Sequence, residues 1–126
     1  MKKINSTMRV HLWFETDSGM LFGLGRVILL KKVNEVGSLN KAAKALGMSY
    51  RAAWGKIKAT EKELGDSLLE KSAEGRGYCL TEYGRSLLED YDRWHREIEA
   101  FALKTADELF PWQVRPYEES RQNGKP

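Results

Sequence analysis

Hydrophobic residues alternate with polar ones near the N-terminus and then change to the spacing of helices. Residues 8–15 (MRVHLWFE) carry apolar side chains at every second position, which is the pattern of a strand. Residues 16–19 (TDSG) are turn formers, and residues 20–23 are expected to return as the second strand of a hairpin. From Gly25 the apolar positions fall three and four apart, which predicts a first helix that ends at Gly37.

Two further helices are predicted, with a short turn between them. The first covers residues 38–46, where apolar side chains fall at i, i+3, i+4 and i+7 and Ser38 is placed to cap the N-terminus. Gly47 suits the turn because glycine adopts left-handed backbone conformations without a steric cost. The next helix covers residues 49–64 and is capped by Ser49. Its buried stripe is expected to contain Ala53, Ile57, Thr60 and Leu64, and its outward side Arg51, Gly55, Lys58 and Lys62, with Trp54 on the flank.

A second hairpin and a long helix complete the pattern. Residues 67–81 (SLLEKSAEGRGYCLT) surround a glycine-containing tip, and Thr81 is placed to cap the helix that follows. With a rise of about 1.5 Å per residue, this helix would be on the order of 40 Å long, too long to pack entirely on so small a core. Pro111 is expected to stop it. Its apolar seam, sustained for about two heptads, consists of Leu87, Tyr91, Trp94, Ile98 and Phe101.

Charge is distributed unevenly along the chain, although the net charge is only +3. Residues 38–65 contain six basic and two acidic side chains, a net of +4, whereas residues 82–110 contain four basic and eight acidic ones, a net of −4. The first segment suits a polyanion and the second repels one. Solvated helix faces, which carry charge in most proteins, are the alternative explanation of the basic segment.

Several classes of function lack support in the sequence. Cys79 is the single cysteine, so an internal disulfide is excluded. His11 and His95 have no ligand-type neighbours at metal spacing, and neither a complete phosphate-binding glycine motif nor a nucleophile with its base is found. We therefore expect no enzyme activity, no metal and no cofactor. No apolar run approaches the roughly 20 residues of a membrane span, and residues 1–15 lack a signal-peptide core, so the cytoplasm is the expected location without membrane contact.

The run SLNKAAKALGMSYRAAWGKIKATEKELGDSLLEKS resembles the N-terminal DNA-binding domain of LysR-type regulators, and more closely that of molybdate-responsive ModE-type regulators. Further points of likeness to the second family are HLWFE, FGLGRVILL, GMSYRAAW and LTEYGRSLL. The resemblance covers about residues 8–105. It implies DNA binding as a dimer in which the last helix joins the subunits. Members of that family continue into a C-terminal molybdate- or tungstate-binding region, which we expect this chain to lack. A signal would then come from a separate sensor protein, or no signal would be sensed.

These observations predict a mainly α fold with small β content, a winged helix-turn-helix followed by a long C-terminal dimerisation helix. We expect residues 1–81 to form the DNA-binding domain and residues 82–110 the dimerisation helix. Residues 111–126 contain three prolines, a glycine and mixed charge, and are predicted to be a mostly disordered tail.

The helix over residues 49–64 is the predicted reader of the DNA major groove. Arg51 is expected to contact a base edge or a phosphate. Ser49 and Tyr50 begin the helix, and Tyr50 is placed to touch a thymine methyl group or a phosphate, or to pack on the neighbouring helix. Gly55 permits close approach to DNA, or is simply tolerated. Lys56 and Lys58 are predicted phosphate contacts, and Trp54 is expected to serve in packing more than in base contact.

The hairpin tip and the preceding helix supply the other predicted contacts. Arg76 lies between two glycines, where it is suited to a minor groove or a phosphate, unless the tip is only a flexible turn. Lys71 would support Arg76 as a second basic DNA contact of the hairpin. Ser38 begins a helix whose N-terminal amide groups can face a phosphate.

The leading hypothesis is a homodimeric, sequence-specific regulator of transcription that binds double-stranded DNA. Two long helices would pair along the seam and set the recognition helices about one DNA turn, or a multiple of it, apart. The alternative is a winged-helix protein-protein interaction module or co-regulator with no direct DNA readout. Winged helices can bind a protein with the same surface, and the aromatic residues Tyr50, Trp54 and Trp94 would serve that role. Direct binding of an oxyanion by this chain is a third hypothesis.

Overall fold

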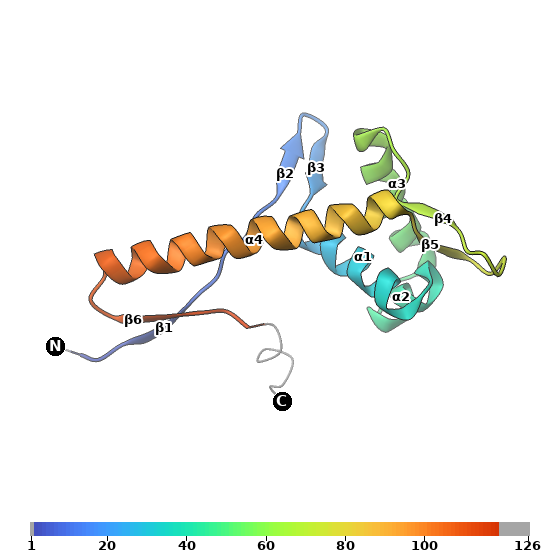
Figure 1. The fold of residues 1–126 in the computed structure, drawn as a ribbon. Coiled ribbons are helices and arrows are strands. Elements are labelled where there is room, and N and C mark those ends of the chain that lie inside the picture. Colours follow the sequence, from blue (N-terminus) through green and yellow to red (C-terminus); the bar gives the residue numbers. More distant parts are fainter. Residues whose placement is uncertain (1, 119–126) are drawn as a thin grey trace. The chain divides into compact units, whose positions relative to one another are not determined.

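The computed structural model describes residues 2–118, which form four helices and three small two-stranded sheets (Figure 1). This confirms the prediction of a mainly α winged helix-turn-helix with a long C-terminal helix. The strands are β1 (Asn5–Met8), β2 (Phe14–Thr16), β3 (Gly19–Phe22), β4 (Leu69–Lys71), β5 (Tyr78–Leu80) and β6 (Gln113–Pro116). The helices are α1 (Leu24–Val36), α2 (Leu39–Ala45), α3 (Tyr50–Leu64) and α4 (Glu82–Leu109).

The described chain divides into two compact units. One comprises residues 12–92 and contains β2 to β5, α1 to α3 and the start of α4. The other comprises residues 2–11 and 93–118 and contains β1, the remainder of α4 and β6. Residues 82–92 of α4 therefore belong to the helix-turn-helix unit, although the sequence placed the whole helix in a separate dimerisation segment.

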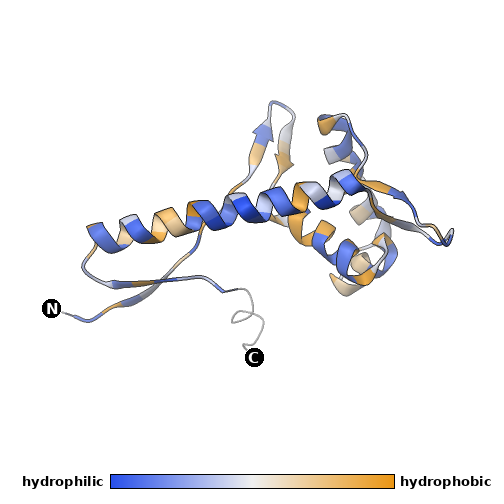
Figure 2. Cartoon of the chain, in the orientation of Figure 1, coloured by the Kyte–Doolittle hydropathy of each residue, from blue (hydrophilic) through white to orange (hydrophobic). Residues whose placement is uncertain are grey.

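The apolar faces of α1, α2 and α3 meet in one core within residues 12–92. Ala42 and Ala43 are fully buried, and their small side chains let α2 cross its neighbours closely. The base of the β4–β5 hairpin (the wing) contributes the buried residues Leu68 and Leu80 to this core. Figure 2 shows hydrophobic stretches on α1, whereas much of α4 is hydrophilic. The buried side chains include Val27, Leu29, Leu30, Val33, Leu39, Ile57, Leu68 and Leu80.

The strand predicted over residues 8–15 is wrong in its bounds. Residues 9–13 form no strand, and β1 ends before them while β2 begins after them. The backbone carbonyls there are bonded by side chains of α4 instead of by a neighbouring strand. The Tyr91 hydroxyl donates to the Leu12 carbonyl at 2.9 Å, and His95 Nε2 lies 3.1 Å from the Val10 carbonyl. β2 and β3 do form the expected antiparallel hairpin, with a register shift after Phe14.

The prediction of a disordered tail is wrong for residues 113–116. They form β6, which pairs in parallel with β1, so that Asn5 lies opposite Gln113 and Met8 opposite Pro116. The Ser6 hydroxyl adds a hydrogen bond of 2.8 Å to the Gln113 carbonyl. The two strands are more than one hundred residues apart in sequence, so no local pattern announces their pairing. Residues 119–126, the end of the predicted tail, lie outside the described chain.

Candidate nucleic-acid interface

Serine side chains cap both helices of the helix-turn-helix, as the sequence predicts. Ser38 Oγ accepts the Lys41 amide at 3.2 Å, and Ser49 Oγ accepts the Ala52 amide at 3.0 Å. These caps satisfy amide groups that the helix itself leaves without acceptors. The N-terminus of α3 is consequently well defined, and Tyr50 in its first turn is 42% exposed.

The inner face of α3 is fixed to the rest of its unit by apolar packing and by one buried hydroxyl. Ala53 and Ile57 are fully buried, and Thr60 is 2% exposed. Thr60 Oγ1 donates a hydrogen bond of 3.1 Å to the Leu21 carbonyl and accepts one of 3.1 Å from Arg26 Nε. Burial lowers the pKa of Arg26 from its ordinary value. Thr60 therefore joins α3 to both β3 and α1.

The outward face of α3 carries basic side chains and one glycine. Arg51 and Lys62 are exposed, and among residues 2–118 neither has an acidic partner within ion-pair distance. A Cβ placed on Gly55 would meet no atom within 4 Å, so the helix surface is open at that point. Lys56 is also exposed but lies on the flank, about 140° around the helix from Arg51. The structure thus places Arg51, Gly55 and Lys62 on one face of α3 and Lys56 on the flank of that face.

Three aromatic rings connect α3 to the wing. The Tyr50 ring stacks on the Trp54 ring at 6.2 Å between centroids, and Trp54 meets Tyr78 of β5 edge to face at 4.8 Å. Lys58 Nζ lies 4.5 Å from the centroid of the Trp54 ring, a cation–π contact. Trp54 is half-buried in this cluster.

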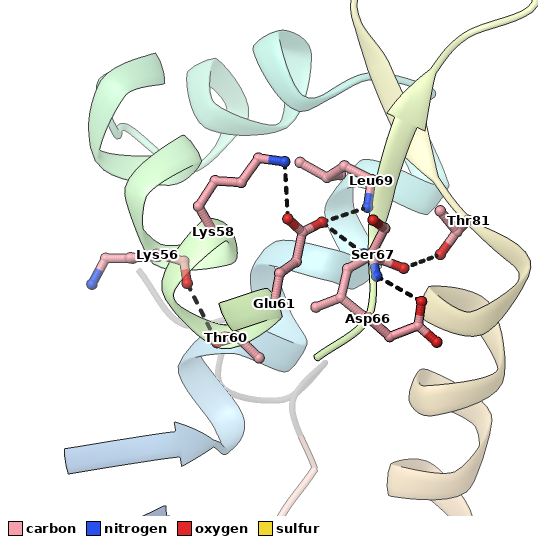
Figure 3. A network of polar contacts seen from close by, with 9 residues as sticks. Lys56, Lys58, Thr60, Glu61, Asp66, Ser67, Leu69 and Thr81 are labelled. Atoms are coloured by element: carbon pink, nitrogen blue, oxygen red, sulfur yellow. Dashed lines mark hydrogen bonds and ion pairs between the residues drawn. The ribbon is translucent and has the colours of Figure 1, made fainter. Parts of the chain in front are cut away.

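Glu61 links the same face of α3 to the start of β4 (Figure 3). Its Oε2 accepts the amides of Leu68 and Leu69 at 2.7 and 3.0 Å, and its Oε1 lies 2.9 Å from Lys58 Nζ. Burial alone would raise the pKa of Glu61. The hydrogen bonds from Lys58 and from the two amides outweigh burial, and the pKa lies below its ordinary value. Lys58, a predicted phosphate contact, is therefore already half of an internal ion pair.

The tip of the wing is an ordered turn. Ser72 Oγ accepts the Arg76 amide and donates to the Arg76 carbonyl, both at 3.0 Å. Gly75 and Gly77 have φ of 72°, a conformation that favours glycine on either side of Arg76. Arg76 and Lys71 are exposed, so both predicted wing contacts are accessible.

The predicted seam of α4 differs in exposure along its length. Tyr91 is only 6% exposed, because its ring packs edge to face on Phe22 at 5.7 Å and its hydroxyl reaches the Leu12 carbonyl. The structure thus places Tyr91 in the core of residues 12–92 and not on an exposed seam. Leu87 and Trp94 are half-buried, whereas Ile98 is 40% and Phe101 66% exposed.

Four residues that shape this surface are not predicted from the sequence. Glu61 accepts amides at the start of the wing, Tyr78 packs on Trp54, and Ser72 orders the tip. Gly84 lets α4 approach the Leu68 carbonyl, just before β4. The i, i+3 spacing of Lys58 and Glu61 was a visible signal for their ion pair. The roles of the other residues depend on contacts between elements.

Other chemistry has little support in the part of the chain that is described. No group of three or more His, Cys, Asp or Glu side chains in residues 2–118 is arranged to hold a metal ion. Cys79 is a free, half-buried thiol in the wing. None of the helices described combines the length and hydropathy that a membrane span requires.

Comparison with known proteins matches residues 24–85 to the bacterial regulatory helix-turn-helix family of the LysR type. The transcriptional regulator ModE of Haemophilus influenzae is 38% identical over 89 residues, which cover 68% of this chain and 35% of that protein. The molybdenum transport protein ModE of Azotobacter vinelandii is 36% identical over 98 residues, which cover 75% of this chain and 36% of that protein. The chain therefore spans about a third of the length of these curated relatives.

A solved structure supports the same fold. The full-length CbnR crystal structure, determined in complex with its target DNA, superposes with a TM-score of 0.50 and 21% identity. The match covers 79% of this chain and 45% of that one. At this level of identity the likeness concerns the fold.

Proposed function

We propose that this chain, which belongs to the LysR-type family of bacterial regulatory helix-turn-helix proteins through residues 24–85, regulates transcription by binding specific sites in double-stranded DNA. The observation that carries the proposal is the outward face of α3. Arg51 and Lys62 are exposed there without an acidic partner in residues 2–118, and Gly55 leaves the surface open between them. A basic helix with a bare central position fits the major groove.

Arg51 is the proposed reader of a base. Its guanidinium can make two hydrogen bonds to a guanine edge, which is the commonest specific contact in the major groove. Tyr50 precedes it with an exposed ring stacked on Trp54, in position for a thymine methyl group or a phosphate. Lys56 and Lys62 are proposed to contact phosphates, and Ser38 and Ser49 define helix N-termini whose amides can do the same.

The wing is proposed to contact DNA beside the major-groove site. The tip presents Arg76 from a turn held by Ser72, and Lys71 is exposed on β4. A guanidinium at a hairpin tip can enter a minor groove or bind a phosphate.

Selection of bound sequences from a random DNA pool tests this function. We expect enrichment of a dyad-symmetric motif, and absence of any enriched motif would refute specific DNA binding. With that motif in hand, Arg51→Ala should lose about 1–3 kcal/mol of binding and relax discrimination at one position. Lys56→Ala should weaken binding to all sequences about equally.

We further propose that the protein acts as a homodimer through α4. Ile98 and Phe101 lie three residues apart on one side of the helix and are exposed, which is costly for an apolar pair in a monomer. Light scattering at micromolar concentration should report a dimer. Phe101→Asp is expected to shift it to a monomer, whereas Ala100→Asp, on the other side of α4, should leave it unchanged. A monomeric wild-type protein would contradict the proposal.

A second candidate is a protein-interaction module or co-regulator. The observation that favours it is the apolar surface at the β2–β3 hairpin, where Met20 in β3 and Trp13 just before β2 are about half exposed. Such a surface also suits a separate sensor protein, which could supply a signal to the regulator. Retention on a polyanion column separates the candidates, because DNA binding weakens steeply with salt and apolar protein contacts do not.

A further inference from the structure

The two surfaces proposed to touch DNA lie on different elements of residues 12–92. Arg51 is on α3, and Arg76 is at the tip of the wing. A two-stranded hairpin is marginally stable by itself, so the direction of the wing depends on what holds its base. One face of α3 does so, through what we call the helix–wing contact: Trp54, Lys58 and Glu61 on α3 with Leu68, Leu69 and Tyr78 on the wing side.

Glu61 holds the first strand of the wing at its start. A single oxygen, Oε2, accepts the amides of two successive residues, Leu68 and Leu69, at 2.7 and 3.0 Å (Figure 3). Both residues are buried, so these amides need a partner inside the protein. Because Leu69 pairs with Leu80 across the hairpin, fixing β4 also fixes β5.

Trp54 holds the second strand from the same face of α3. Its ring meets Tyr78 in β5 at 4.8 Å between centroids. Lys58 connects the two attachments, since its ammonium group lies 4.5 Å from the Trp54 ring centroid and 2.9 Å from Glu61 Oε1. Both strands are thus tied to one stripe of the helix that carries Arg51.

The charge of Glu61 makes its role measurable. A carboxylate near a DNA-binding face opposes a polyanion, so removing it should strengthen binding if charge alone mattered. Glu63 is a matched control, because it is an exposed carboxylate on the same helix, about 200° around from Glu61. No ion pair joins Glu63 to another of residues 2–118.

We propose that Glu61 and Trp54 are positioning residues for DNA recognition, which hold the wing so that Arg76 reaches DNA while Arg51 occupies the major groove. The inference rests on the proposed function, and neither residue needs to touch DNA itself. Loss of the helix–wing contact should therefore lower the affinity for DNA only by changing the position of the wing.

The test is a double-mutant cycle on the selected DNA site. Glu61→Ala should lower affinity about tenfold, the size of one lost protein–DNA contact, whereas Glu63→Ala should leave it equal or raise it. In an Arg76→Ala background, Glu61→Ala should cause no further loss. Trp54→Leu should follow the same pattern. Glu61→Ala behaving like Glu63→Ala, or an undiminished loss in the Arg76→Ala background, would overturn the inference.

Amide hydrogen exchange provides a readout independent of DNA. Glu61→Ala should accelerate exchange in residues 78–80, and Glu63→Ala should not. Unchanged exchange there would overturn the inference even if DNA binds, whereas faster exchange without any DNA binding by the wild type would refute the proposed function alone. If the alanine variant fails to fold, Glu61→Gln replaces it in the double-mutant cycle. This variant keeps an oxygen for the two amides and loses the ion pair with Lys58.

Discussion

The carbonyl oxygen of Leu68 lies 2.9 Å from the place that a Cβ on Gly84 would occupy. Gly84 is buried in the first turn of α4, and the same turn is capped by Thr81, whose Oγ1 accepts the Gly84 amide at 3.0 Å and donates to the Ser67 carbonyl at 2.8 Å. The start of α4 is thus packed directly on the backbone that enters the wing.

Gly84→Ala is therefore expected to destabilise the protein. The added methyl group meets a backbone atom that cannot rotate away, and overpacking of this kind costs roughly 1–3 kcal/mol. Urea denaturation measures the loss. Gly25→Ala is the control, because a Cβ at that helical position meets nothing within 4 Å. Equal stability of the two variants would show that α4 is not closely packed on the Leu68 backbone.

Gly55→Ala should separate stability from binding. The position is helical and open, so alanine should raise the free energy of unfolding by about 0.5–1 kcal/mol. If α3 approaches DNA closely at Gly55, the same methyl group should weaken DNA binding, which fluorescence anisotropy measures. A stabilised variant with unchanged affinity would contradict close approach at this position.

Lys58 should contribute less to salt dependence than an unpaired lysine. Each phosphate contact adds about 0.9 to the slope of log K against log salt, through release of counterions. Lys58 is already paired with Glu61, whereas Lys56 has no ion pair within residues 2–118. Lys58→Ala should thus flatten the slope less than Lys56→Ala does. The reverse order would mean that Lys58 leaves Glu61 when DNA binds.

Acidification should weaken the attachment of the wing through Glu61. Its pKa lies below the ordinary value of 4.5, so the charged form stabilises the fold above that pH. This stabilisation is lost as the pH falls through the lowered pKa. We expect the unfolding free energies of the wild type and Glu61→Gln to converge in that range, as measured by denaturation at a series of pH values. A difference that stays constant would contradict the role of the charge.

Tyr91→Phe should cost about 0.5–1.5 kcal/mol of stability, the typical net value of one hydrogen bond. The ring contact with Phe22 is kept, and the bond from the hydroxyl to the Leu12 carbonyl is lost. Tyr83→Phe, at an exposed position of α4, is the control and should be nearly neutral. Thermal denaturation of both variants measures the difference.

The sequence alone determined the helices and turns of this protein. Residue spacing and capping act over three or four neighbours, so Ser38, Ser49 and Thr81 could be assigned as caps before any fold was known. The outward placement of Arg51 and Gly55 on α3 followed from helical period in the same way. The resemblance to known regulators added the expectation that these elements form a winged helix-turn-helix that binds DNA.

Only the tertiary structure decided which side chains meet across elements. Tyr91 fits a heptad seam by spacing, yet it turns to Phe22 and Leu12 because the core of its own unit offers a ring contact and an acceptor. β6 exists because β1 offers a partner from the far end of the chain. Nothing in the local sequence distinguishes Glu61 from a surface carboxylate. The fold brings the amides of Leu68 and Leu69 to it. Such contacts depend on distances between segments remote in sequence, which periodicity and composition do not encode.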